Sequence, residues 1–167
     1  MKANIGIPEH DIEEIVKFLN ILLADEYALY TKTRNAHWNV NSSNFHDLHK
    51  FFESQYEALD IIIDDTAERV RALGHYALGS LKDFLSVTHM DEENHDFSNP
   101  MQIIQTLIND HETIIRIIRK EIVPISEKYR DLGTADFVTG IMEQHEKMAW
   151  MLRSHIQTAV PVNSNFN

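Results

Sequence analysis

The sequence predicts an all-α protein built from four long helices, with one short helix in a long crossover between the second and the third. Two observations support this prediction. Apolar residues recur at helical spacing along four long segments, and residues that favour turns separate those segments. The length of 167 residues suits one domain with a single core. We therefore expect one domain over residues 1–167, with short tails at residues 1–8 and 160–167.

The first two helices are predicted on either side of a short polar loop. The first begins at residue 9 or 11 and ends near residue 39. Asn and Ser dominate positions 39–44, and both favour turns and helix caps. The second helix should run from residue 45 to residue 73, because glycine, here Gly74, commonly ends helices. The apolar stripes of the two helices are Ile12, Ile15, Leu19, Leu22 and Tyr30, and Leu48, Phe52, Leu59, Ile62, Ile63 and Val70.

The second half of the chain predicts a short helix near residues 80–87 and two further long helices. Asn99 and Pro100 are a typical cap and first residue of a helix, and Pro124 should kink or end that helix. The last helix is expected from residue 135 to residue 157, with Thr134 as its cap. One long connection between the second and third helices is the arrangement of a ferritin-like four-helix bundle.

One face of the second helix carries only acidic residues and a histidine. Such a stripe is most often a solvated surface, but His37 at the end of the preceding helix adds a second imidazole near it. A helix rises about 1.5 Å per residue, so His49 and Asp64 lie roughly 22 Å apart and no ion can contact both. The stripe consists of His49, Glu53, Glu57, Asp60, Asp64 and Glu68.

A symmetric dimer would bring the two ends of this stripe together. Antiparallel pairing about a two-fold axis near the middle of the helix places His49 opposite Asp64 of a second copy, and Glu53 opposite Asp60. Paired carboxylates repel each other unless they are protonated or bind a metal. Imidazole and carboxylate ligands suit Fe(II), and zinc accepts the same ligands. The pattern thus predicts a metal site shared between two copies, with iron or zinc as its metal.

Composition limits the other classes of function. The chain has no cysteine, which excludes a disulfide framework and a thiolate metal site and agrees with a reducing cytoplasm. We find no apolar run near the roughly 20 residues that span a bilayer, and the N-terminus lacks the apolar core of a signal peptide. We therefore expect a cytoplasmic protein without membrane contact.

Several segments resemble the Dps family of mini-ferritins over nearly the whole chain. They are NAHWNV at residues 35–40, FHDLH at 45–49, DDTAER at 64–69, TAD at 134–136 and HEKMAWMLR at 145–153. The most specific of these features is the pair His37-Trp38, followed 27 residues after His37 by the Asp-x-x-x-Glu-Arg motif of residues 64–69. The resemblance implies a hollow dodecamer of four-helix subunits with a ferroxidase centre at each two-fold interface.

The resemblance also implies roles for individual residues. His37 and His49 of one subunit, and Asp64 and Glu68 of its mate, would hold the iron, with Glu53 as a further ligand. Such proteins oxidise Fe(II), often with hydrogen peroxide in preference to oxygen, and store Fe(III) mineral. In this interpretation Trp38 could give up an electron when peroxide is present and iron is scarce. A packed aromatic residue at a helix end is the alternative interpretation of Trp38.

Three features depart from the family pattern. Glu53 stands where the family typically has aspartate, and the longer side chain changes how its carboxylate can reach a second iron. Lys50 lies next to the site, where some relatives carry acidic residues that nucleate mineral. The chain ends lack the lysine-rich tail of DNA-binding members, and the net charge is −11, so DNA binding is not expected. A DNA-compacting protein and a structural shell without ferroxidase activity are the alternative functions.

Overall fold

The structure is a computed structural model that describes residues 3–91 and 99–156. The predicted tail at residues 160–167 and the predicted helix end at Gln157 lie outside these residues. None of the described helices is both long and apolar enough to cross a membrane.

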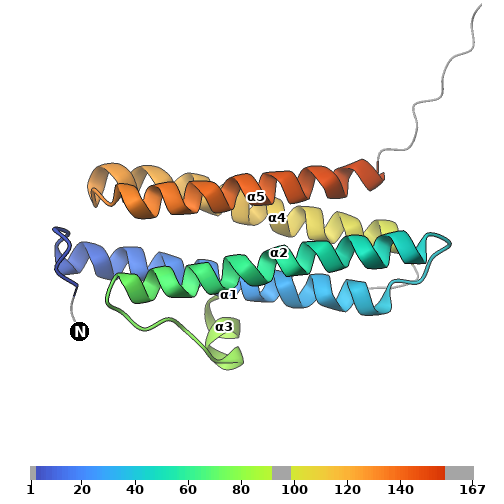
Figure 1. Ribbon diagram of the computed structural model, residues 1–167, viewed down its shortest axis with the longest axis horizontal. Coiled ribbons are helices and arrows are strands. Elements are labelled where there is room, and N and C mark those ends of the chain that lie inside the picture. The colour runs from blue at the N-terminus through green and yellow to red at the C-terminus, as the bar shows by residue number, and fades with distance from the viewer. Residues whose placement is uncertain (1–2, 92–98, 157–167) are drawn as a thin grey trace, which may run out of the picture.

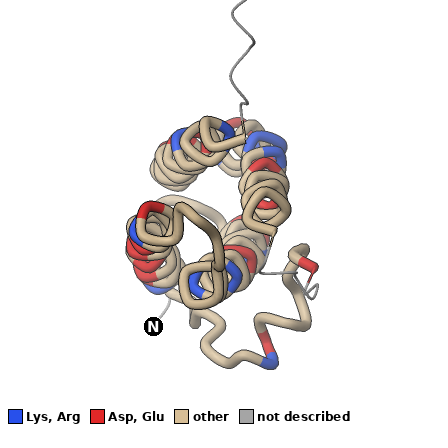
Figure 2. Tube along the Cα trace, turned by 90° about the vertical axis from the view of Figure 1, so that its right-hand side faces the viewer, with Lys and Arg blue, Asp and Glu red and all other residues tan. Residues whose placement is uncertain are grey.

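Four long helices form a bundle, and a short helix lies beside it. Helices α1 (Glu9–Asn39) and α2 (Phe45–Ala72) pack along each other, as do α4 (Pro100–Val123) and α5 (Leu132–Ile156). Figure 1 shows the two pairs as two layers with nearly parallel axes, and places the short α3 (Leu81–Val87) outside them. The end-on view in Figure 2 shows the four long helices around a common centre, with the crossover on the outer side. The predicted all-α, ferritin-like bundle is therefore confirmed.

Most of the predicted helix boundaries agree with the structure. Gly74 has a φ of +89°, a left-handed conformation that glycine adopts without strain, and it follows the end of α2. The side chain of Asn99 accepts a hydrogen bond from the backbone N–H of Gln102, which caps α4 as expected. At Pro124 the α-helix gives way to a π-helical turn, η1 (Pro124–Lys128), because proline cannot continue the regular hydrogen-bond ladder.

The predicted start of the last helix is wrong. Helix α5 begins at Leu132, and the residue that caps it is Asp131, whose carboxylate accepts hydrogen bonds from the backbone N–H and the hydroxyl of Thr134. Thr134 therefore lies in the first turn and not at the cap. The guanidinium of Arg69 in α2 contacts both Asp131, at 3.3 Å, and the Thr134 hydroxyl, at 2.8 Å, and so joins the start of α5 to α2.

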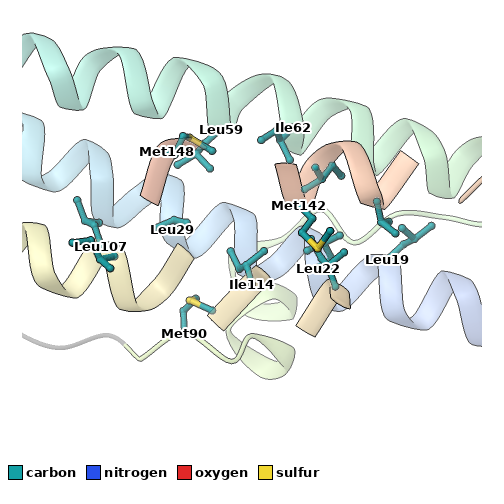
Figure 3. Close-up of a cluster of buried hydrophobic side chains, with 14 of the residues drawn as sticks. Leu19, Leu22, Leu29, Leu59, Ile62, Met90, Leu107, Ile114, Met142 and Met148 are labelled. Carbon is teal, nitrogen blue, oxygen red and sulfur yellow. The ribbon is translucent and has the colours of Figure 1, made fainter. Parts of the chain in front are cut away.

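Apolar side chains from all four long helices fill the centre of the bundle. Figure 3 shows Leu22, Leu59, Ile62 and Ile114 pointing into this core beside Met142 and Met148. The predicted stripes of the first two helices are buried there, with Tyr30 and Ile63 only partly covered. Close packing of this kind, and not helix propensity, supplies most of the stability of such a bundle.

Candidate metal centre

The last turn of α1 and the second turn of α2 bring His37 and His49 into direct contact. The two rings stack with their centroids 3.7 Å apart and their planes 21° from parallel. The Nδ1 of His37 lies 2.8 Å from the carbonyl oxygen of His49, and the Nδ1 of His49 lies 2.8 Å from the carbonyl oxygen of His37. The antiparallel pairing of the two helices around a short loop makes this exchange possible.

These two hydrogen bonds determine which ring nitrogens can bind a metal. A carbonyl oxygen can only accept, so each Nδ1 must carry the hydrogen and donate it. In the neutral imidazole the other nitrogen, Nε2, then has a free lone pair. Holding the ring through Nδ1 while Nε2 binds a metal is the usual arrangement of histidine ligands. Both histidines are therefore prepared as Nε2 ligands.

Two aromatic rings restrict the orientation of the histidine pair. The ring of Phe45 stacks on His49 at 5.1 Å, and the ring of Tyr56 meets His37 edge to face at 5.2 Å. His37 is almost fully buried, whereas His49 is partly exposed. The His37 ring is thus held inside the protein, whereas the exposed part of His49 is accessible to an ion or to a second molecule.

Glu53 lies one turn after His49 on α2 and is bound to a lysine. Its carboxylate lies 2.5 Å from the Nζ of Lys50. This hydrogen bond and the lysine charge lower the pKa of Glu53 below its usual value. Glu53 is therefore ionised and able to bind a cation. Lys50 is mostly exposed, so its flexible side chain can leave the carboxylate when a metal arrives.

Asp64 and Glu68 do not join the histidines within one chain. Both lie on α2, where an unbroken helix separates them from His49, and both are exposed. In residues 3–91 and 99–156 no three His, Asp or Glu side chains gather closely enough to hold a metal ion. One chain thus presents a histidine half and an acidic half at two places along the same helix. Their union across an interface stays a prediction.

Trp38 is exposed over 62% of its surface and does not point into the core. The guanidinium of Arg34 lies 5.5 Å from its ring centre, an attractive cation–π contact. A role of Trp38 in electron transfer stays a prediction.

A second polar group, which we did not predict from the sequence, lies in the middle of the bundle. The Nε2 of His145 lies 2.9 Å from a carboxylate oxygen of Glu26, and its Nδ1 lies 2.9 Å from the Nδ1 of His111. All three residues are buried, and the second carboxylate oxygen of Glu26 has no hydrogen-bond partner among the described residues. Burial lowers the pKa of His111 well below its usual value, and the charge of His145 lowers it further. His111 is therefore neutral.

A signal for this buried group was present in the sequence. Each of its members occupies a core position of an apolar stripe: Glu26 follows Leu22 by four residues, His111 follows Leu107 by four, and His145 precedes Met148 by three. A charged residue at such a position must find a partner inside the protein. Three polar residues on three stripes could therefore have been expected to meet.

Comparison with known proteins agrees with the fold. A model of the ferritin-like domain matches residues 16–160. A low temperature-induced protein of Nostoc is 40% identical over 98% of this chain and 91% of its own. The "DNA protection during starvation protein" of Helicobacter pylori is 32% identical over 86% of this chain and 96% of its own.

A solved structure gives the same result. The Dps protein of Vibrio cholerae, described as a member of the superfamily of ferritin-like diiron-carboxylate proteins, superposes with a TM-score of 0.87 at 26% identity. The match covers 93% of this chain and 97% of that one. By fold, by family model and by sequence similarity, the chain belongs to the Dps family of mini-ferritins within the ferritin-like superfamily.

Proposed function

We propose that the protein is a ferroxidase and iron store. It oxidises Fe(II), with hydrogen peroxide as the preferred oxidant, and keeps the Fe(III) product as a mineral inside a hollow assembly of twelve copies. The observation that carries this proposal is the histidine pair, in which the Nε2 atoms of His37 and His49 are both left free for a metal. The described relationship of the Vibrio cholerae protein to diiron-carboxylate proteins supports iron as the metal.

The complete centre forms when two copies pair through α2. An antiparallel pairing brings His37 and His49 of one copy to Asp64 and Glu68 of the other, with Glu53 beside them, and the same arrangement recurs once by symmetry. Imidazole and carboxylate ligands leave open positions on Fe(II) for an oxidant. The exposed acidic residues along α2 provide the negative charge that attracts the cation.

The chemistry removes both reagents that produce hydroxyl radicals. Two Fe(II) ions supply the two electrons that reduce one hydrogen peroxide to two water molecules, with uptake of two protons. Both electrons arrive together, so no hydroxyl radical is released. Zn(II) accepts the same ligands but cannot be oxidised, so it should act as an inhibitor.

We infer that the protein limits oxidative damage by removing iron and peroxide, without binding DNA. The net charge of one chain is −11, and an assembly multiplies that charge, which opposes contact with phosphate groups. The lack of cysteine agrees with a reducing compartment, and we place the activity in the cytoplasm.

Stopped-flow measurement of Fe(II) oxidation tests the proposal. Fe(II) bound without oxygen and then mixed with peroxide should oxidise much faster than with oxygen, and added Zn(II) should slow the reaction. Asp64→Asn should reduce the rate at least about tenfold, because a neutral amide binds a metal ion more weakly than a carboxylate. Asp65→Asn is the matched control, since Asp65 is the adjacent exposed carboxylate. Oxidation no faster than that of free Fe(II) would exclude a ferroxidase, and equal losses in both variants would exclude this ligand set.

A further inference from the structure

The aromatic ring in contact with the candidate ligand His37 belongs to a tyrosine. Tyr56 meets His37 edge to face with ring centroids 5.2 Å apart. Tyr56 itself is only partly buried. A redox-active side chain is therefore in direct contact with a candidate iron ligand. The function proposed above does not use it.

Tyr56 is the first of three tyrosines that continue away from this ligand. Tyr30 of α1 lies edge to face with Tyr56 at 6.0 Å, and Tyr27, one turn earlier on α1, lies 6.0 Å from Tyr30. The three rings thus form a continuous series of contacts between α1 and α2. No gap in the series exceeds the normal spacing of interacting aromatic rings, which is about 4.5–7 Å.

The guanidinium of Arg34 lies close to two of these tyrosine rings and to Trp38. The Cζ of Arg34 lies 5.1 Å from the ring centre of Tyr56, 5.6 Å from that of Tyr30 and 5.5 Å from that of Trp38. Arg34 also donates a hydrogen bond to the Tyr30 hydroxyl. The network holds both tyrosine rings in place, and it adds a permanent positive charge beside all three aromatic side chains.

That positive charge discriminates between tryptophan and tyrosine as electron donors. An indole that loses an electron is a radical cation until its N–H proton leaves, and a cation formed beside Arg34 is repelled. A tyrosine releases its phenolic proton together with the electron, so no cation forms and nothing is repelled. The charge of Arg34 therefore disfavours oxidation of Trp38 and leaves the tyrosines as the better donors.

We propose that Tyr56, with Tyr30 behind it, is the one-electron donor to the iron centre when only one Fe(II) is bound. This inference rests on the ferroxidase function proposed above. One Fe(II), one hydrogen peroxide, one tyrosine and one proton give one Fe(III), one neutral tyrosyl radical and two water molecules. The O–O bond of peroxide breaks, iron and tyrosine each lose one electron, and the phenolic proton enters the water that forms. Without the tyrosine the second electron is missing, and a hydroxyl radical is released.

Electron paramagnetic resonance of rapidly frozen samples tests the proposal. The full-length assembly is loaded with one Fe(II) per predicted site and mixed with hydrogen peroxide, and the organic radical is counted per Fe(III) formed. Wild type should give a radical whose hyperfine splitting narrows when the protein contains ring-deuterated tyrosine. Tyr56→Phe should lower the radical yield per Fe(III) several-fold and raise the amount of hydroxyl radical caught by a spin trap.

Two variants serve as comparisons. Tyr76→Phe is the matched control, because Tyr76 also lies under a guanidinium, that of Arg71 at 4.4 Å, but it is exposed and lies beyond the C-terminal end of α2, away from the histidine pair. It should behave as wild type. Trp38→Phe should leave a radical of the same shape and yield.

The possible failures can be told apart. If wild type forms no Fe(III) faster than free iron does, the ferroxidase function is wrong. If wild type forms Fe(III) but its radical persists unchanged in Tyr56→Phe, or disappears in Trp38→Phe instead, the assignment of the donor to Tyr56 is wrong while the function stands. Loss of the signal in Tyr76→Phe would likewise refute a donor beside His37.

Discussion

Metal sites shared between subunits can be recognised by combining two inactive variants. We consider assemblies made from equal amounts of His37→Ala and Asp64→Ala chains. No group of three ligands forms within the described part of one chain, and each proposed site needs His37 of one copy and Asp64 of the other. Either variant alone should therefore lose both sites of every two-fold interface. A mixed pair, in contrast, combines the intact histidines of one chain with the intact carboxylates of the other at one of its two sites.

The size of the recovery follows from counting. With random pairing, half of the interfaces are mixed, and each mixed interface has one intact site of two, so about a quarter of the wild-type sites should return. The chains are co-expressed with two different tags, the mixed assemblies are purified, and the initial rate of Fe(II) oxidation by peroxide is measured. Sites contained within one chain would give no recovery.

A matched negative control uses two variants of the same half-site. His37→Ala combined with His49→Ala leaves every histidine pair broken, because the two imidazoles belong to one chain and contact each other at 3.7 Å. No activity should return. Recovery in this control equal to that of the first mixture would refute the division of ligands between chains.

The remaining predictions concern stability, measured by denaturant unfolding at one fixed protein concentration. Burial lowers the pKa of His111 in the folded protein below its unfolded value of about 6.5, so below that pH only the unfolded chain gains the proton. The stabilisation by neutral His111 is complete above about pH 6.5 and is lost as the pH falls, by up to about 1.4 kcal/mol per pH unit. His111→Gln should flatten this slope, and an unchanged slope would contradict the assignment. Leu59→Ala should lower the free energy of unfolding by about 2–5 kcal/mol, because Leu59 is fully buried. Leu59→Met should lower it by less than about 1.5 kcal/mol. Similar losses in the two variants would exclude tight packing around Leu59. Asp131→Ala should cost about 1–2 kcal/mol and Asp131→Asn much less, since asparagine also caps helices. Equal losses would assign the effect to the Arg69 contact and not to the cap.

Helices were predictable where local interactions determine them. The apolar stripes, the glycine after α2 and the Asn99-Pro100 start of α4 act within one or two turns of the chain. The start of α5 was predicted wrongly because Asp131 and Thr134 are both good caps by residue type. In the structure Asp131 takes the cap position, since its carboxylate accepts a hydrogen bond from the backbone N–H of Thr134.

The candidate site was only partly predictable. Spacing along α2 identified the histidine and the acidic residues, because positions on a rigid helix can be calculated. The exchange of hydrogen bonds between His37 and His49 could not be calculated, since it depends on how α1 returns alongside α2. The contact of Tyr56 with His37 depends on the same packing.

By itself, the sequence determined the class of the fold, the long helices and the separation of two sets of candidate ligands along one of them. These properties follow from the helical repeat, which every residue of a helix shares. Only the tertiary structure decided the histidine tautomers, the aromatic series beside His37 and the buried contacts of Glu26, His145 and His111. Each of these joins residues from different helices. Their distances depend on how side chains interdigitate in the core, which the periodicity of a single helix does not specify.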